Sequence, residues 1–323
     1  MIGIKRIKNC LLTITGLLFI LTGHVWAEDG IPEGYILVEG DILIPVDAAY
    51  DGAYGATLWT NGVISYEFHD NVNATNQQRA IDAMEAWSET TTVTFIPHTT
   101  EANYVRFMDH DSRNYSALGM VGGRQTIAIH RWDRFGTIAH EIGHTLSLFH
   151  EQGRPDRVDY VTINTDRINE DGGNNFNLVP SAQVYGPYDF DSVMHYSQCS
   201  FSICDDCSVD PDNCRTITVN PLYATEWQDK IGQRTHLSYL DQVTIQMLYP
   251  ETYWKFINGN YTGLPHYPET GSFTWPYNTF AEGIGAVLPG GTLIVQPDTY
   301  VLTGYTFSKH MLIRAPLGDV LIE

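Results

Sequence analysis

The chain has 323 residues, of which 43% are hydrophobic and 12% aromatic, so it is long and apolar enough to bury a core. Its 18 basic and 38 acidic residues give a formal net charge of −20 at pH 7. Such a charge repels polyanions, which excludes nucleic acids and anionic membrane surfaces as expected partners.

The N-terminus has the three parts of a secretory signal peptide. Basic residues at positions 5, 6 and 8 precede an apolar run from residue 10 to residue 21, and Ala27 offers a small residue for cleavage. The run is too short for a membrane anchor, and no later stretch approaches ~20 apolar residues. We therefore expect residues 1–27 to be a signal peptide and the mature protein to be secreted, into the extracellular space or the periplasm, with no membrane attachment.

Residues 57–150 show strand-like and helix-like patterns. Alternation and β-branched content predict strands at 63–68, 91–97, 104–108 and 125–130. After Thr75, the residues Ala80, Met84 and Trp87 recur at helical spacing. We expect a twisted sheet over a helix, with one edge strand able to pair with an extended substrate backbone.

Residues 140–150 place three imidazoles and one carboxylate at the spacing that a catalytic zinc ion needs. On a helix, His140 and His144 lie one turn apart on the same face, and Glu141 projects beside them. His150 then approaches from beyond the helix end. Zinc held by three neutral histidines keeps one position for a water molecule and lowers its pKa to about 7, and Glu141 takes the proton as the zinc-bound water attacks a carbonyl. The pattern predicts metal-assisted peptide hydrolysis, against the alternative of a chance match on an amphipathic helix.

One position departs from the pattern H-E-x-x-H-x-x-G-x-x-H, because Ser147 stands where the pattern has glycine. A glycine there ends the helix in the left-handed conformation and lets the chain turn back. A serine costs on the order of 1 kcal/mol if it keeps the same dihedral angle. The sequence leaves two alternatives, a positive φ at Ser147 or a turn that is built differently.

A methionine turn, Ser-Val-Met-His-Tyr, follows at residues 192–196. Other matching features are Glu151, the Arg-Pro-Asp-Arg stretch at 154–157, and Ile-Gly-Gln-Arg at 231–234 followed by Leu237, Ser238 and Asp241. With these motifs, residues 57–250 resemble the astacin family of zinc metalloendopeptidases, within the metzincins. The resemblance implies an α+β fold: a two-lobed metzincin-like zinc protease domain with a twisted sheet, an active-site helix and the methionine turn.

The resemblance also implies one catalytic zinc ion. His140, His144 and His150 correspond to the zinc ligands of the family, and Glu141 corresponds to its general base.

Serine and aspartate at positions 238 and 241 are also a good N-terminal cap for a helix that we expect near 238–248.

Three neighbouring residues of the methionine turn are expected to differ in role. Met194 corresponds to the apolar floor under the metal. Tyr196 corresponds to the tyrosine that ligates zinc at rest, swings away during turnover and stabilises the oxyanion with its hydroxyl. We do not expect His195 to bind zinc, because three histidines already fill the site. We interpret it as a residue that supports the ligands from outside or packs in the interior.

Residues 28–56 are predicted to be a pro-segment. The stretch Val38-Glu39-Gly40-Asp41 resembles the F-x-G-D motif of astacin pro-segments, with valine in place of phenylalanine. In that family the aspartate occupies the zinc position that water needs, so we expect Asp41 to ligate the metal in the latent form only. Cleavage is expected within residues 46–56. The alternative is a plain glycine–aspartate turn in a short linker.

Four cysteines lie just after the methionine turn, at positions 199, 204, 207 and 214. In an oxidising compartment, two local disulfides are favoured over a structural zinc site of four thiolates. Three connectivities are possible, and the spacing does not choose among them.

Residues 251–323 have a different character. Proline and glycine recur between short predicted strands at 292–295, 300–302 and 311–315. The segment resembles the opening coil of a right-handed parallel β-helix. Because about three repeats are needed for a stable solenoid, we expect either a truncated β-helix or a small accessory module that packs on the protease.

Together these features predict a secreted zinc endopeptidase that is made as a latent zymogen and acts on protein or peptide substrates. Two alternatives remain. One is a catalytically inactive zinc-containing binding protein, and the other is an adhesin or glycan-binding protein that acts through the C-terminal β-segment. The sequence does not predict the cleavage-site preference, the physiological substrate or the oligomeric state.

Overall fold

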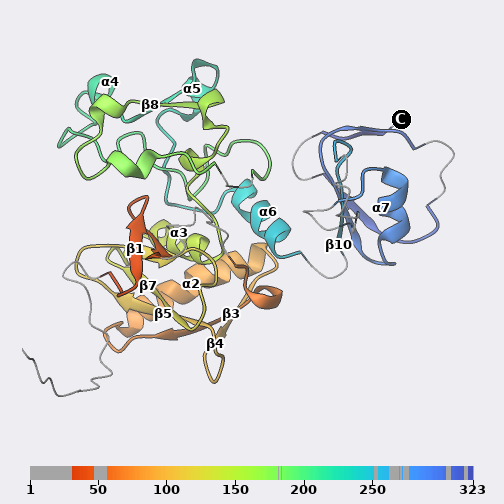
Figure 1. Cartoon of the computed structure of the whole chain (residues 1–323), viewed down its shortest axis with the longest axis horizontal. Helices are drawn as coiled ribbons and strands as arrows, with labels where there is room; N and C mark the ends of the chain where they lie inside the picture. Colours follow the sequence, from red (N-terminus) through yellow and green to blue (C-terminus); the bar gives the residue numbers. More distant parts are fainter. Residues whose placement is uncertain are drawn as a thin grey trace, which may run out of the picture.

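In a computed structural model of the chain, the described residues are 31–46, 57–180, 182, 184–250, 254–261, 269, 271, 276–302, 307–315 and 319–322. Figure 1 shows three parts: a first lobe with residues 57–150, a second lobe with residues 151–250, and a β-rich unit that follows residue 254 and stands beside both lobes. The predicted signal peptide, 1–27, and most of the predicted cleavage window, 46–56, lie outside the described residues.

The first lobe and the segment before it share a sheet of seven strands in the order β1-β2-β6-β7-β5-β3-β4. The strands are β1 (Tyr35–Val38), β2 (Ile42–Pro45), β3 (Val63–Phe68), β4 (Thr94–Pro97), β5 (Tyr104–Asp109), β6 (Tyr115–Ala117) and β7 (Arg124–Ile129). Strands β4, β3, β5 and β7 are parallel, and β6 runs antiparallel to β7. The four strands predicted for this region are confirmed, whereas β6 is too short to show an alternating pattern.

Strand β6, which is the last strand of the lobe's own residues on this side of the sheet, is paired with the segment that precedes the lobe. Strands β1 and β2 form an antiparallel hairpin, and β2 pairs in parallel with β6, with Ile42 opposite Ser116 and Leu43 opposite Ala117. The backbone N–H of Ser116 donates to the carbonyl oxygen of Asp41 at 2.9 Å. The segment predicted as the pro-segment therefore occupies the sheet edge that we expect an extended substrate to use.

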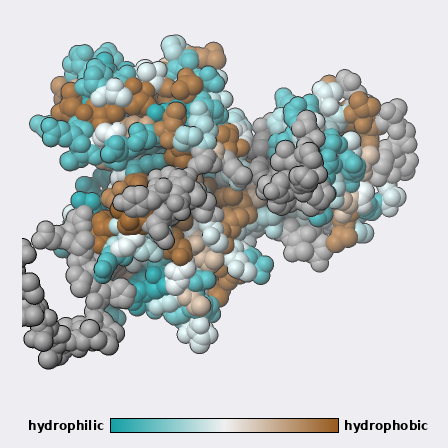
Figure 2. All heavy atoms as spheres, in the orientation of Figure 1, coloured by the Kyte–Doolittle hydropathy of each residue, from teal (hydrophilic) through white to brown (hydrophobic). Residues whose placement is uncertain are grey.

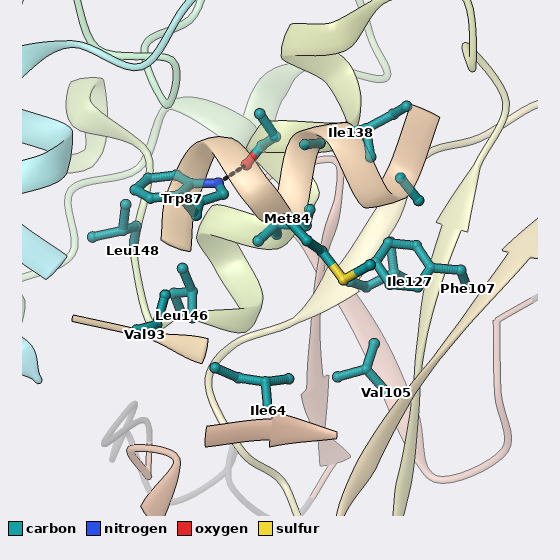
Figure 3. Close-up of a cluster of buried hydrophobic side chains, with 14 of the residues drawn as sticks. Ile64, Met84, Trp87, Val93, Val105, Phe107, Ile127, Ile138, Leu146 and Leu148 are labelled. Atoms are coloured by element: carbon teal, nitrogen blue, oxygen red, sulfur yellow. Dashed lines mark hydrogen bonds between the residues drawn. The ribbon is translucent and has the colours of Figure 1, made fainter. Parts of the chain in front are cut away.

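Helices α2 (Ala74–Thr90) and α3 (Phe135–Thr145) pack together and enclose the core of this lobe with the sheet. The indole Nε1 of Trp87, on α2, donates to the carbonyl oxygen of Ala139, on α3, at 3.1 Å (Figure 3). Met84 extends from the same helix toward Phe107 and Ile127 of the sheet. The predicted helical face is thus the core face, and burial of Met84 alone contributes roughly 1.5–3 kcal/mol. Residues of α3, among them Ile138 and Ile142, belong to this core, which holds the helix in place.

The second lobe has little regular structure. Its elements are η2 (Glu151–Gly153), η3 (Arg157–Asp159), β8 (Val161–Ile163), η4 (Thr165–Arg167), η5 (Gly173–Phe176), α4 (Pro211–Cys214), β9 (Ile217–Val219), α5 (Pro221–Trp227) and α6 (Tyr239–Leu248). Aromatic rings hold these pieces together, for example Tyr160 stacked on Tyr188 with centroids 4.7 Å apart. At the start of α6, Ser238 and Asp241 form a capping box, which confirms the predicted helix and its cap.

The β-rich unit contains parallel strands. Strands β10 (Trp254–Ile257), β11 (Thr292–Val295) and β13 (Leu312–Arg314) form one parallel sheet, and β12 (Thr299–Tyr300) pairs in parallel with β14 (Leu321–Ile322). Helix α7 (Phe280–Ala286) packs on this unit through Phe280 and Ile284, which contact Ile257 and Leu293. The resemblance to the opening coil of a β-helix stays a prediction.

An apolar contact joins the β-rich unit to the second lobe. Val243 and Met247 of α6 cluster with Trp254 and Phe256 of β10. Figure 2 shows hydrophilic and hydrophobic residues intermixed over the three parts on the face in view. Among the helices of the described part of the chain, none has the length and apolar content needed to cross a bilayer.

Candidate metal centre

Helix α3 supplies two buried imidazoles whose outer nitrogens are held by backbone carbonyls. Nδ1 of His140 lies 2.8 Å from the carbonyl oxygen of Val193, and Nδ1 of His144 lies 2.7 Å from that of Leu148. Because a carbonyl oxygen only accepts, each Nδ1 carries the proton, so Nε2 of each neutral ring carries a lone pair. Burial and the charge of Arg234 lower the pKa of His140 to about 3, which keeps this ring in the neutral form that ligates a metal.

The turn after α3 is a Schellman motif with serine in the position that glycine usually takes. The N–H of Leu148 donates to the carbonyl oxygen of Gly143 at 2.9 Å, and the N–H of Ser147 donates to that of His144 at 2.8 Å. Ser147 has a φ of +81°, so of the two alternatives the serine adopts the left-handed conformation. The same turn brings the Leu148 carbonyl to the His144 ring and leads the chain to His150.

His150 returns toward the helix and meets Asp41 there. Nε2 of His150 lies 3.2 Å from Nε2 of His140. The carboxylate oxygens of Asp41 lie 3.3 Å from Nε2 of His140, 3.5 Å from Nε2 of His144 and 3.2 Å from Nε2 of His150. One possible ligand atom from each of the four side chains lies within 4.8 Å of all the others. The predicted metal residues from α3, from the following turn and from the pro-segment therefore meet at one point.

The four inner ligand atoms can bind a cation more favourably than they can bind one another. In the neutral form that ligates a metal, with Nδ1 donating, the Nε2 atoms of His140 and His150 both carry lone pairs, which cannot form a hydrogen bond across 3.2 Å. Nε2 of His144 and Oδ1 of Asp41 are buried and make no hydrogen bond to any described residue. Burial lowers the pKa of His150, but the carboxylates of Asp41 and Glu39 outweigh burial and raise it to about 9, so this point favours positive charge. Three imidazole nitrogens and one carboxylate oxygen are a tetrahedral donor set for zinc.

Glu141 lies on α3 between the two helical histidines in sequence and is 1% exposed. Its Oε2 makes no hydrogen bond within the described part of the chain. Burial raises the pKa of Glu141, the Asp41 carboxylate raises it further, and Arg234 opposes both. This carboxylate therefore has an oxygen available to accept a proton next to the clustered imidazoles.

Tyr196 lies beside His150, with ring centroids 4.5 Å apart. Its hydroxyl donates to the backbone carbonyl oxygen of Glu39, and its backbone N–H donates to Oε1 of Gln152 at 3.0 Å. The tyrosine is thus next to the candidate ligands but bonded to the predicted pro-segment. Its role as a zinc ligand at rest stays a prediction.

The methionine turn is tied to α6 and to the helical histidine. Asp241 accepts the hydroxyl proton of Ser192 at 2.6 Å and the N–H of Val193 at 2.9 Å, while the Val193 carbonyl accepts from His140. Met194 approaches α3 closely, because a Cβ placed on Gly143 would stand 2.5 Å from its sulfur. The absence of a side chain at Gly143 allows Met194 to pack against α3, and its role as the floor under the metal stays a prediction.

His195 is buried in the second lobe and lies outside the four-residue cluster. Its Nε2 lies 2.8 Å from the hydroxyl of Tyr188, and its Nδ1 lies 2.7 Å from the carbonyl oxygen of Tyr196. Burial lowers the pKa of His195 to about 4. These contacts agree with its interpretation as a packing residue.

Comparison with known families decides what kind of centre this is. Residues 52–250, more than half of the chain, match the model of the peptidase family described as Astacin. The chain belongs to the astacin family. The two-lobed α+β fold predicted from the sequence is therefore confirmed. Astacins use one catalytic zinc ion, and the cluster of three histidines and one aspartate is able to bind it.

Individual astacins give the extent of the similarity. Zinc metalloproteinase nas-36 of Caenorhabditis elegans is 36% identical over 196 residues, which cover 59% of this chain and 30% of that protein. Astacin-like metalloprotease toxin 1 of Loxosceles intermedia is 32% identical over 231 residues, which cover 69% of this chain and 84% of the toxin. Among solved structures, high choriolytic enzyme 1, a hatching enzyme zinc-protease from Oryzias latipes (medaka), matches with a TM-score of 0.53 and 32% identity over 60% of this chain and 93% of the enzyme.

Two disulfides cross-link the loop beside the astacin metal centre. They join Cys199 to Cys207 and Cys204 to Cys214. The prediction of two local disulfides is confirmed, and the structure decides among the three connectivities. The loop carries Phe201, whose ring centroid lies 5.6 Å from that of Tyr196 and whose Cζ would stand 3.0 Å from a Cβ placed on Gly40. The cross-linked loop therefore contacts both the predicted catalytic tyrosine and the pro-segment.

The sequence does not indicate the contacts of three residues in or around the centre: Glu39, Gln152 and Arg234. Glu39 accepts from Nδ1 of His150 at 2.8 Å, and Gln152 accepts from the backbone of Tyr196. The buried guanidinium of Arg234 donates to the carbonyl oxygen of His195 at 3.0 Å. Each lies within or next to a matching astacin motif, but the motif does not tell which atom the side chain meets.

Proposed function

We propose that this chain is a zinc-dependent endopeptidase that hydrolyses peptide bonds in protein or peptide substrates. The observation that carries the proposal is the convergence of three imidazoles on one point beside Glu141. His140, His144 and His150 would hold the zinc ion. The names of the relatives, which call them zinc metalloproteinases, support the same activity. The alternatives of an inactive binding protein or an adhesin receive no comparable support.

When bound, the zinc ion would polarise a peptide carbonyl and lower the pKa of a water molecule. Glu141 is the base that takes the proton from the attacking water, because it lies on the helix that carries His140 and His144 and its buried Oε2 makes no hydrogen bond to another described group. The carboxyl group then gives this proton to the leaving amine nitrogen.

Tyr196 is the donor for the negative charge that develops on the substrate oxygen. Its hydroxyl donates to a backbone carbonyl oxygen, that of Glu39, right beside His150. A substrate carbonyl presented at the same place would accept the same hydrogen bond, and more strongly as it becomes an oxyanion. The rings of Phe176 and Phe201 pack against Tyr196 and restrict its orientation.

Digestion of casein by the processed protein, with and without a zinc chelator, tests the proposed activity. We expect proteolysis that the chelator abolishes and that added zinc restores, because the attacking water is activated only when the metal is bound. Proteolysis that persists after complete removal of zinc would contradict the proposal.

We further propose that residues 28–56 keep the enzyme latent. The Asp41 carboxylate faces the three Nε2 atoms, and a carboxylate is a competent zinc ligand that would take the position needed by water. Gly40, with a φ of +87°, lets the backbone pass Tyr196, since a Cβ there would stand 3.3 Å from the tyrosine hydroxyl. Strand β2 also covers the edge of β6. The segment would therefore keep water from the metal and keep a substrate backbone from pairing with β6.

Peptidase assays on the uncleaved chain test this latency. The parent should be nearly silent, whereas Asp41→Ala should hydrolyse peptide without processing. Glu33→Ala is a matched control, because it removes one charge from an exposed position of the same segment and should stay silent. Equal activity of the uncleaved parent and Asp41→Ala would reduce the segment to a spacer.

We also propose that residues 1–27 direct secretion, that 57–250 form the catalytic domain and that 251–323 form a separate β-rich segment. The basic, apolar and small-residue pattern supports the first part, and the two disulfides support passage through an oxidising compartment. N-terminal sequencing of the exported protein should begin at Glu28 or later. An intracellular protein that retains residues 1–27 would contradict the proposal.

A further inference from the structure

The three imidazoles of the centre differ in what holds their outer nitrogens. Nδ1 of His140 and Nδ1 of His144 donate to carbonyl oxygens of Val193 and Leu148, which belong to the astacin domain itself. Nδ1 of His150 donates instead to the carboxylate of Glu39 at 2.8 Å. Glu39 precedes the residues that match the family model, so one ligand of the three is oriented by the proposed pro-segment.

Several contacts fix Glu39 in this position. Its side chain is 9% exposed and that of His150 is 0% exposed, so water has little access to the hydrogen bond between them. The backbone of Glu39 has a φ of +50°, a conformation that costs about 1 kcal/mol for a residue with a side chain. Its carbonyl oxygen accepts the Tyr196 hydroxyl, and its carboxylate lies 3.6 Å from the Cβ position of Gly153. Such strain persists only where surrounding contacts determine the position, and here they direct the carboxylate to His150.

A carboxylate on the outer nitrogen acts on the metal through the ring. It keeps the proton on Nδ1, fixes the orientation of the imidazole and raises the basicity of Nε2. Loss of such a partner typically lowers metal affinity 10- to 100-fold. An ionised acceptor also makes a hydrogen bond about twice as strong as a neutral one, so His150 has a stronger outer partner than His140 or His144.

We propose that Glu39 is a positioning residue for the zinc ligand His150, and that the pro-segment therefore retains the metal as well as blocking it. The inference rests on the proposed latent form, in which residues 28–56 are still attached. Asp41 faces the inner nitrogens of the ligands, while Glu39 holds the outer nitrogen of one of them. When the cleaved segment leaves, His150 loses its carboxylate partner and the processed enzyme holds zinc less tightly.

Zinc affinity of the uncleaved chain, measured by competition with a chromophoric chelator, tests this role. In an Asp41→Ala background, which removes the inner carboxylate, a further Glu39→Ala change should weaken zinc binding 10- to 100-fold. Glu39→Gln keeps an acceptor for Nδ1 and should restore most of the affinity. Glu33→Ala removes one charge from an exposed position of the same segment and should leave the affinity unchanged.

A spectroscopic readout reports on the ring itself. In the zinc-loaded uncleaved chain labelled with ¹⁵N-histidine, the Nδ1 proton of His150 should give a downfield, slowly exchanging signal. Glu39→Ala should remove or shift this signal and leave those of His140 and His144 in place. Thermal unfolding checks the fold of each variant, and Glu39→Gln, which shifts the same signal less, serves if Glu39→Ala does not fold.

Equal zinc affinity with and without Glu39 in folded Asp41→Ala protein would overturn the proposal, as would an unchanged His150 signal. If the proposed latency through Asp41 is wrong, a different measurement shows it, namely peptidase activity of the uncleaved parent. That result would leave the effect of Glu39 on zinc affinity intact, so the two proposals fail separately.

Discussion

The two sides of the metal centre are built in different ways. On one side, His140, Glu141 and His144 lie within a little more than one turn of α3, and helical geometry alone brings them together. On the other side, Asp41 and Tyr196 come from segments far apart in the sequence. These residues depend on sheet pairing, aromatic packing and hydrogen bonds between segments.

The difference shows which residues of the metal centre the proposed pro-segment can regulate. The helical side is held by partners that belong to the astacin domain, such as the carbonyl of Val193. On the remote side, Tyr196 donates to the backbone of Glu39, and the Glu39 carboxylate accepts from the candidate ligand His150; Glu39 belongs to the proposed pro-segment. Residues of the proposed pro-segment thus contact residues that only tertiary structure positions.

The largest effect is expected on the helical side. Glu141→Ala removes the base but no imidazole, so turnover of the processed enzyme should fall about 10³- to 10⁴-fold while zinc stays near one equivalent. His144→Ala should lose the metal as well. Metal analysis alongside peptide kinetics measures both effects. Substantial proteolysis by purified Glu141→Ala would end the assignment of this residue as the base.

A smaller effect, on stability, is expected at Asp241, which ties the methionine turn to α6. Asp241→Ala leaves the Ser192 hydroxyl and the backbone N–H groups of Val193 and Ser238 without their acceptor. Unsatisfied buried donors should lower the free energy of unfolding by about 2–4 kcal/mol. Urea unfolding measures this loss, and Asp241→Asn, which keeps one oxygen, should lose less. A loss below about 0.5 kcal/mol would mean that the methionine turn does not depend on α6.

On the remote side, Tyr196→Phe should lower kcat of the processed enzyme about 10²-fold and leave KM nearly unchanged, because the hydroxyl acts mainly in the transition state. Steady-state kinetics on one peptide separates the two constants. A change confined to KM would instead make Tyr196 a residue that positions the substrate.

The smallest effect concerns the turn that connects the two sides. Ser147→Gly removes the steric cost of a φ of +81° and should raise the free energy of unfolding by about 1 kcal/mol. The same change at Ser88, in the last turn of α2, should not raise it, because glycine is a weaker helix former than serine. Thermal unfolding compares the two variants. No gain at Ser147 would show that other contacts compensate for its conformation.

Local patterns predicted much of the first lobe and of the site. Strand β3, helix α2 and the capping box of α6 follow from alternation, helical spacing and a serine–aspartate pair. Strand β6, which has three residues, is too short to show a period. Helix α7 is hidden because two of its seven residues are glycines.

The sequence by itself determined the helix and the histidines and glutamate on it that are proposed as ligands and base, because a period of 3.6 residues converts spacing directly into a shared face. It also determined the position of the unusual Ser147. Only the tertiary structure decided the disulfide partners, the pairing of β2 with β6 and the contact between Glu39 and His150. These features depend on distances between segments remote in sequence, and no local periodicity encodes such distances.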